Sequence, residues 1–156
     1  MDQTVKQTLV AGIVGQKATN AQTLPIVGAL NSTDQTLNIF GRSFDQNQDG
    51  TFSVGAGVNF LTILTNAKNA PMVSPSSTPL GYLENGKIGE FERMGEFFVS
   101  LVGNAGYVGN CIQASTTTGE LKACEVGANA DAGYVKYPKS TITKKMSDNI
   151  FVISIF

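Results

Sequence analysis

Residues 96–102 read EFFVSLV and place Phe97, Val99 and Leu101 on one face of an extended chain. Alternation of apolar and polar side chains is typical of a β-strand with one buried face. A second run, NIFVISIF at residues 149–156, consists almost entirely of strand-forming residues. An exposed edge strand of this composition would invite aggregation. We therefore expect 149–156 to be buried, either in the domain or in an interface.

Short apolar runs, each closed by turn-forming residues, continue outward from these two segments. No stretch of twelve or more residues carries a helical period. Strands of four to eight residues separated by turn signals are typical of a β-sandwich or barrel. The sequence therefore predicts an all-β chain with one β-sandwich or barrel-like domain. The apolar runs lie at residues 9–14, 25–30, 37–40, 56–64, 107–112 and 120–124.

Two segments depart from this strand pattern. Residues 1–25 are low in charge, and we expect them to form an extended N-terminal arm before a β domain at 26–156. Residues 67–81 (AKNAPMVSPSSTPLG) hold three of the five prolines, which excludes a helix or a central strand. Long loops without secondary structure usually have a function. We expect this Pro-rich loop to contact a neighbouring subunit, with a mobile loop as the alternative.

The charge balance gives no drive toward nucleic acid or membranes. Eleven Lys and Arg face twelve Asp and Glu, so the net charge is −1, and only 15% of residues are charged against a usual value of about 25%. The single basic cluster, Lys144 and Lys145 with Lys136 and Lys139 nearby, is small, and we expect a solvated loop there. No apolar run of about 18 residues predicts a membrane span. The start of the chain lacks the features of a signal peptide, so we expect synthesis in the cytoplasm.

The chain has no histidine, which removes the commonest general base and metal ligand. Glycine-rich phosphate loops are also missing from the sequence. Glu90 and Glu92 share one face of a strand and could in principle serve a glycosidase. We expect instead a solvated strand face with Arg93 nearby. The sequence thus predicts a protein without enzymatic activity, cofactor or small-molecule substrate.

The sharpest local motif is DQNQDGTFS at residues 45–53, which matches the start of a calcium loop. Its ligands would be Asp45, Asn47, Asp49, the Thr51 carbonyl and Ser53. The position of the bidentate Glu in such loops holds Ala56, and no helical pattern flanks the motif. Asp-Gly is also a strong turn pair. We expect a β-hairpin turn and keep calcium binding as the alternative.

The two cysteines, Cys111 and Cys124, flank a Thr- and Gly-rich turn, as expected for two facing strands. A disulfide between them is geometrically possible. Two buried or half-buried free thiols are the alternative, and both stay open at this point.

The order of these segments resembles a known family, the structural cement or decoration proteins of tailed phages. The likeness covers most of the chain, but it rests on turns and strands and involves no catalytic signature. The motif GKIGEFERMGEFFV at residues 86–99 carries it most clearly. The other stretches are ALNSTD at 29–34, NIFGRSF at 38–44, DGT at 49–51, VGAG at 54–57, 60–64, and STTTGEL at 115–121.

The resemblance implies an all-β domain that clamps major capsid protein subunits together on the exterior of the virion, often as a homotrimer. It implies no catalytic residues, and the two cysteines depart from the family pattern. We expect contacts from the arm, the Pro-rich loop and residues 91–98. The predicted contact residues are Val10, Ile13, Pro71, Met72, Pro75, Pro79, Phe91, Met94 and Phe98.

Three other functions fit parts of the sequence. A phage tail or receptor-binding β-module would show an exposed aromatic cluster or groove, which the sequence does not locate. A pilin-like or adhesin domain would use residues 111–124 as a disulfide loop but would need an upstream membrane helix. A small hydrolase would rely on Glu90 and Glu92.

Overall fold

The computed structural model describes residues 14–19, 22–66, 81–103 and 107–156. Among these the chain is all-β, which confirms the predicted fold class, and a single 3₁₀ turn, η1 (Gln35–Leu37), is the only helical element. The strands are β1 (Pro25–Ala29), β2 (Phe44–Gln46), β3 (Phe52–Val54), β4 (Ile63–Thr65), β5 (Ile88–Glu92), β6 (Gly95–Ser100), β7 (Cys111–Ser115), β8 (Leu121–Cys124), β9 (Tyr134–Tyr137), β10 (Ser140–Lys145) and β11 (Ile150–Ile155).

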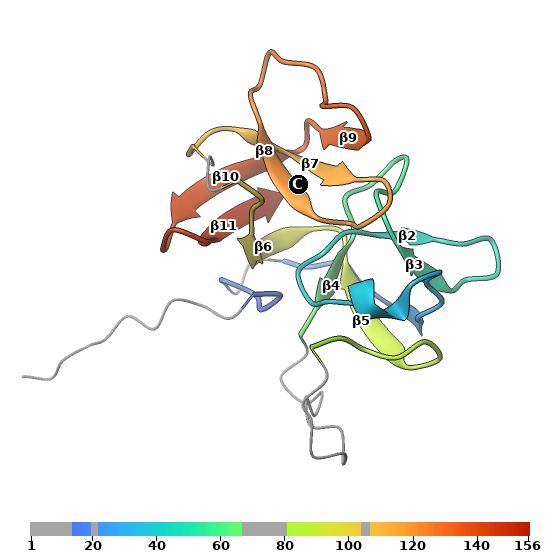
Figure 1. Cartoon of the computed structure of the whole chain (residues 1–156). Helices are drawn as coiled ribbons and strands as arrows, with labels where there is room; N and C mark the ends of the chain where they lie inside the picture. Colours follow the sequence, from blue (N-terminus) through green and yellow to red (C-terminus); the bar gives the residue numbers. More distant parts are fainter. Residues whose placement is uncertain (1–13, 20–21, 67–80, 104–106) are drawn as a thin grey trace, which may run out of the picture.

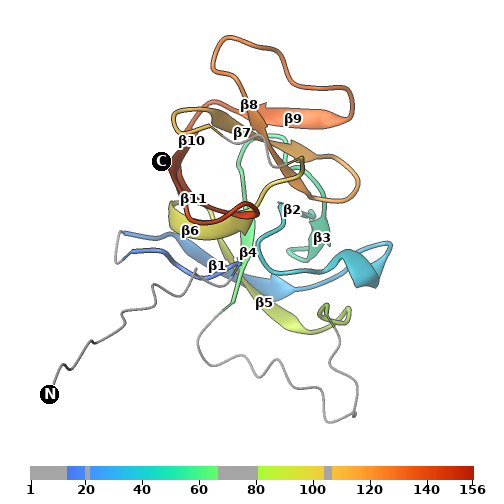
Figure 2. The same cartoon turned by 60° about the vertical axis from the view of Figure 1, so that its left-hand side comes forward.

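The strands form four small antiparallel sheets and, within the described residues, no closed barrel (Figure 1). The sheets β10-β11-β6 and β8-β7-β9 contribute side chains to one large core, as in a sandwich. The sheet β1-β5-β4 and the hairpin β2-β3 surround a second, smaller core (Figure 2).

The larger core is built mainly from aliphatic side chains of long strands. Phe97 and Val99 on β6 are fully buried, and Leu101 directly after the strand is nearly so, which confirms the face predicted for residues 96–102. Strand β11 lies in the middle of its sheet and pairs with β10 on one side and β6 on the other. Phe151, Val152, Ile153 and Ile155 are therefore buried by the domain itself, which removes the aggregation hazard of an apolar edge. Asn149 and Phe156 at the ends of the segment are exposed, so the expected burial of 149–156 is wrong for these two residues.

The smaller core depends on three phenylalanines. Phe52 stacks on Phe91 with ring centroids 3.8 Å apart and an interplanar angle of 12°. Phe44 meets the same Phe91 ring at 5.4 Å and 60°. Leu30 and Leu64 complete this cluster. Because β2, β3 and β4 have only three residues each, large rings supply burial that short strands cannot.

The described end of the predicted arm adds to the domain's own sheet. Gly15 N donates to Phe98 O at 2.8 Å, Phe98 N donates to Gln16 O at 2.9 Å, and Ala18 N donates to Glu96 O at 2.8 Å. Residues 15–18 thus lie along the edge of β6 that β11 leaves free. The predicted contact residues Val10 and Ile13 lie outside the described residues, as do Pro71, Met72, Pro75 and Pro79.

Candidate interaction face

The two segments expected to reach a neighbour join the domain side by side. Val14 is the first described residue after residues 1–13, and Asn66 is the last before residues 67–80. Asn66 N donates a 2.9 Å hydrogen bond to Gly15 O. The arm and the Pro-rich loop, 50 residues apart in sequence, therefore start from one place on the domain.

This junction depends on two glycines that lie against each other. Gly15 has φ +86° and Gly41 has φ +81°, a backbone region that side chains disfavour. A Cβ on Gly15 would lie 2.7 Å from the Phe40 Cβ, and a Cβ on Gly41 would collide with the Val14 side chain. Gly41 N also donates to Leu64 O at 2.8 Å, which ties the junction to β4. The base of the arm is thus packed tightly onto the domain.

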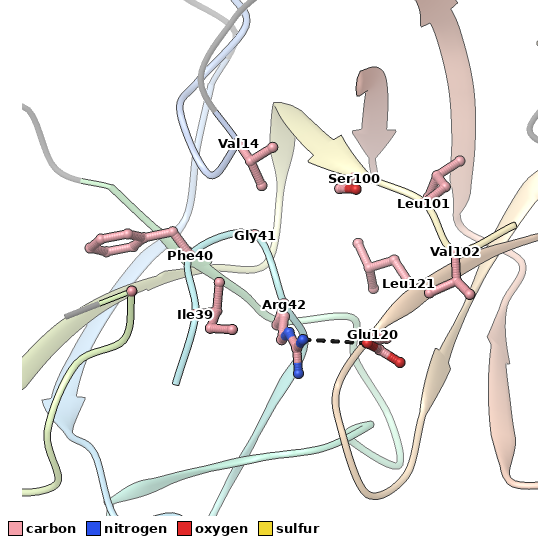
Figure 3. Close-up of a pocket in the computed structure, with 11 residues that line it drawn as sticks. Val14, Ile39, Phe40, Gly41, Arg42, Ser100, Leu101, Val102, Glu120 and Leu121 are labelled. Carbon is pink, nitrogen blue, oxygen red and sulfur yellow. Dashed lines mark hydrogen bonds and ion pairs between the residues drawn. The ribbon is translucent and has the colours of Figure 1, made fainter. Parts of the chain in front are cut away.

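A hollow of about 460 Å³ opens beside the junction (Figure 3). It lies where the two cores meet, since Leu101 and Leu121 belong to the larger core and Phe40 packs on the smaller one. Val14 and Gly81, which adjoin the arm and the Pro-rich loop, both line it. The lining residues are Val14, Ile39, Phe40, Gly41, Arg42, Gly81, Ser100, Leu101, Val102, Glu120 and Leu121.

Arg42 and Glu120 are the ionisable residues among the described residues that line this hollow, and they pair with each other. Arg42 Nη2 lies 3.3 Å from Glu120 Oε1, and Arg42 Nη1 donates to Thr118 O at 3.0 Å (Figure 3). The pair is partly exposed and therefore contributes little stability by itself. With an apolar lining and a neutralised charge at the edge, the hollow can accept apolar side chains.

The three described residues predicted as contacts on 91–98 have different positions. Phe91 is fully buried in the smaller core, so its assignment as a contact is wrong: stacking on Phe52 removes the ring from the surface. Phe98 is half-buried beside the base of the arm, to which its backbone is hydrogen-bonded. Met94 is also half-buried and lines a different groove, described below.

Glu90 and Glu92 do not form the solvated strand face that we expected. The Glu92 side chain is fully buried, and its Oε1 lies 2.8 Å from Lys17 Nζ, which is also 3.9 Å from Glu90 Oε1. Beyond this ion pair no hydrogen bond from the described residues reaches the Glu92 carboxylate. Arg93 points elsewhere and donates to Thr62 Oγ1 and Gln46 Oε1. The carboxylates thus hold Lys17, in the described part of the arm, against the sheet.

The motif at residues 45–53 forms the predicted hairpin, with its turn between β2 and β3. Its oxygens are engaged with one another: Thr51 N and Oγ1 donate to Asp49 Oδ1 at 2.9 and 2.7 Å, and Ser53 Oγ donates to Asn47 Oδ1 at 3.2 Å. These bonds lower the pKa of Asp49, with the Thr51 hydroxyl the larger cause. In the described part of the chain no three His, Cys, Asp or Glu side chains gather as a metal site. Calcium binding stays a prediction.

Cys111 and Cys124 face each other directly in the β7–β8 ladder, as the sequence predicted, and both are buried free thiols. Cys111 Sγ donates to the Cys124 carbonyl at 3.2 Å. Burial raises the pKa of the Cys124 thiol. Of the two possibilities left open by the sequence, the structure contains the two free thiols and not the disulfide.

The small basic cluster does not form the solvated loop that we expected, because Lys136 lies on β9 and Lys144 and Lys145 lie on β10. Lys139, Lys144 and Lys145 are exposed, and Lys145 pairs loosely with Asp148 at 3.8 Å. Lys136 instead donates to the carbonyls of Glu125, Val126 and Ala128 at 2.5–2.9 Å and closes the loop between β8 and β9. Across the described ranges, no helix has the length and apolarity that crossing a membrane requires.

Comparison with known proteins shows the fold alone. No family model matches the chain, and no curated protein matches it significantly. A solved chain from a structure titled "The capsid of Myoviridae Phage XM1" matches with a TM-score of 0.63 at 10% sequence identity. The match covers 99% of this chain and 96% of that chain.

Proposed function

We propose that this chain is a virion structural protein that decorates and stabilises a tailed-phage capsid by binding across major capsid protein subunits. In this proposal it has no enzymatic activity, is made in the host cytoplasm and binds the capsid exterior as a homotrimer. One observation carries the proposal: the fold likeness to a chain of a phage capsid extends over nearly the whole length of both chains.

The interaction face supports this proposal. The arm and the Pro-rich loop start together beside an apolar hollow, so two of the expected contact elements and the hollow lie on one part of the surface. A standard interface of about 1,600 Å² needs such an apolar centre with a polar rim. A protein that binds the assembled lattice and not its separated subunits stabilises the assembled state by mass action.

Co-sedimentation with expanded, empty capsids tests the proposal. The purified chain should pellet with capsids at a fixed copy number per capsomer and stay in solution with unassembled capsid protein. Light scattering of the free chain should give three times its 16.5 kDa mass. A monomer that ignores capsids at micromolar concentration would contradict the proposal.

A receptor-binding module is the second candidate, because the structure contains an exposed aromatic groove that the sequence did not locate. Binding to host cells or glycans without any binding to capsids would favour it.

A further inference from the structure

Exposed apolar side chains from four distant parts of the chain line one groove of about 600 Å³. Val58, Phe60 and Phe156 are 81%, 56% and 66% exposed, and Leu24 and the half-buried Met94 lie beside them. Single exposed apolar residues are normal, whereas several converging on one groove mark an interaction site.

One wall of this groove is held in place by a buried hydrogen bond. The Tyr137 hydroxyl on β9 donates to Gly57 O at 2.6 Å and so ties the loop before Val58 to the larger core. Burial raises the pKa of Tyr137 to about 12, so the hydroxyl remains a donor at neutral pH. A wall fixed before binding lowers the entropic cost of receiving a partner.

The rim of the groove is positive. Arg93, Lys136 and Lys139 line it, and no Asp or Glu among the described residues does. Arg93 lies over the Phe60 ring at 5.0 Å. The ion pairs recorded for the described residues use other cations, so these three have no carboxylate partner there. In a chain with net charge −1 this rim is a local excess of positive charge.

We propose that this groove binds a segment of the capsid lattice protein in which apolar side chains are flanked by Asp or Glu. The apolar side chains of the groove contact those of the partner, and the exposed Lys139 pairs with a carboxylate. Lys136 and Arg93 are hydrogen-bonded within the domain and contribute their positive charge to the rim. The inference rests on the proposed function and adds a second contact surface to it. Two separate surfaces on one domain allow it to contact two lattice subunits at once, which raises the avidity.

The groove is tested by two substitutions at exposed positions, Val58→Asp with Lys139→Glu. The matched control is Val108→Asp with Lys144→Glu, a similarly exposed valine and lysine that do not line the groove. The groove variant should bind empty capsids at least tenfold more weakly than the native chain, and the control within twofold. Equal binding of both variants would overturn the inference while leaving the proposed function intact.

A second measurement does not depend on capsids. Two synthetic peptides with the same apolar residues, one flanked by Glu and one by Lys, are titrated against the native chain. The acidic peptide should bind at least tenfold more tightly at low salt, weaken with added salt, and lose this advantage with Lys139→Glu alone. No preference, or a preference for the basic peptide, overturns the inference. If the chain binds the acidic peptide but does not bind capsids, the proposed function is contradicted, and the preference of the groove for acidic apolar segments is supported.

Discussion

The two cores of this domain are stabilised in different ways. The larger core packs aliphatic side chains from strands of four to six residues, and its central strand β11 is paired on both sides. The smaller core packs the Phe44 and Phe52 rings of three-residue strands against the Phe91 ring of the five-residue strand β5. In a long strand, alternation of apolar and polar side chains buries one whole face. The three-residue strands β2 and β3 bury little apolar surface in this way and depend on large aromatic rings.

A buried polar network built around Asn38 lies beside the smaller core. The fully buried Asn38 accepts from Ser32 Oγ at 2.5 Å and donates to Leu83 O and Asn85 Oδ1 at 2.8 and 3.0 Å. Ser32 Oγ in turn accepts from Val54 N at 2.8 Å on β3. These bonds connect η1, β3 and the loop before β5. The irregular half therefore combines ring packing with buried side-chain hydrogen bonds.

The largest effect is expected from removing the ring shared by the aromatic pairs. Phe91→Ala should lower the free energy of unfolding by about 3–5 kcal/mol, since it leaves a cavity between Phe44 and Phe52. Urea unfolding measures it, with the half-buried Phe98→Ala as the milder control. Ile153→Ala in the larger core should cost about 2–5 kcal/mol. A cost for Phe91→Ala below that of Phe98→Ala would break the comparison.

The next effect concerns the polar network. Asn38→Ala should cost roughly 2–3 kcal/mol, because Ser32, Asn85 and the Leu83 carbonyl each lose a buried partner. Thermal unfolding measures the loss, and the exposed Asn149→Ala serves as the control. If the two variants unfold alike, side-chain hydrogen bonds do not hold the smaller core.

A smaller, pH-dependent effect belongs to the larger core. Because burial raises the pKa of Tyr137 to about 12, the unfolded chain loses this proton first, near its ordinary value of 10. The native chain should therefore lose about 2 kcal/mol of stability between pH 10 and pH 12 that Tyr137→Phe does not lose. Urea midpoints across this range measure the difference. If the free energy of unfolding falls equally with pH for both proteins, ionisation of the buried Tyr137 hydroxyl does not cause the loss of stability.

The smallest effect is expected at the hairpin turn. The Thr51 hydroxyl and N–H lower the pKa of the exposed Asp49, so its stabilisation is present above the ordinary aspartate range and is lost as pH falls through the lowered value. The melting temperature should therefore fall slightly for Asp49→Asn at pH 6 and not at pH 2. The exposed Asp148→Asn is the control. Calcium that raises the melting temperature of the native chain alone would instead support the calcium alternative.

Sequence patterns predicted the regular half well and the irregular half poorly. Alternation at residues 96–102 and the β-formers at 149–156 correctly indicated strands. Successive side chains of a strand point to opposite faces, so apolar residues at every second position mark the face that is buried. Phe91 was predicted as a surface contact and Glu92 as part of a solvated strand face, and both predictions were wrong. Adjacent residues of a strand point to opposite faces, yet here both side chains are fully buried. Only the packing of the Phe52 ring and the approach of Lys17 account for that burial.

The two interaction surfaces differ in the same way. The proline content of residues 67–81 singled out a loop with a function, but nothing in the sequence placed its start next to Gly15. The groove combines Leu24, Val58, Met94 and Phe156, which come from four separate segments of the sequence. Met94 was predicted as a contact residue, but no pattern in the sequence joined it to the other three.

By itself, the sequence determined the all-β class, the strands β6 and β11 of the larger core, the hairpin at Asp49-Gly50 and the facing positions of Cys111 and Cys124. These are local properties, set by alternation and turn chemistry over a few residues. The tertiary structure decided the strands β9 and β10, the aromatic stack, the ion pair of Lys17 with the buried Glu92, the junction of arm and loop, and the basic-rimmed groove. Each of these joins residues far apart in the chain, and contacts at such separation follow from packing of the whole domain and not from any local pattern.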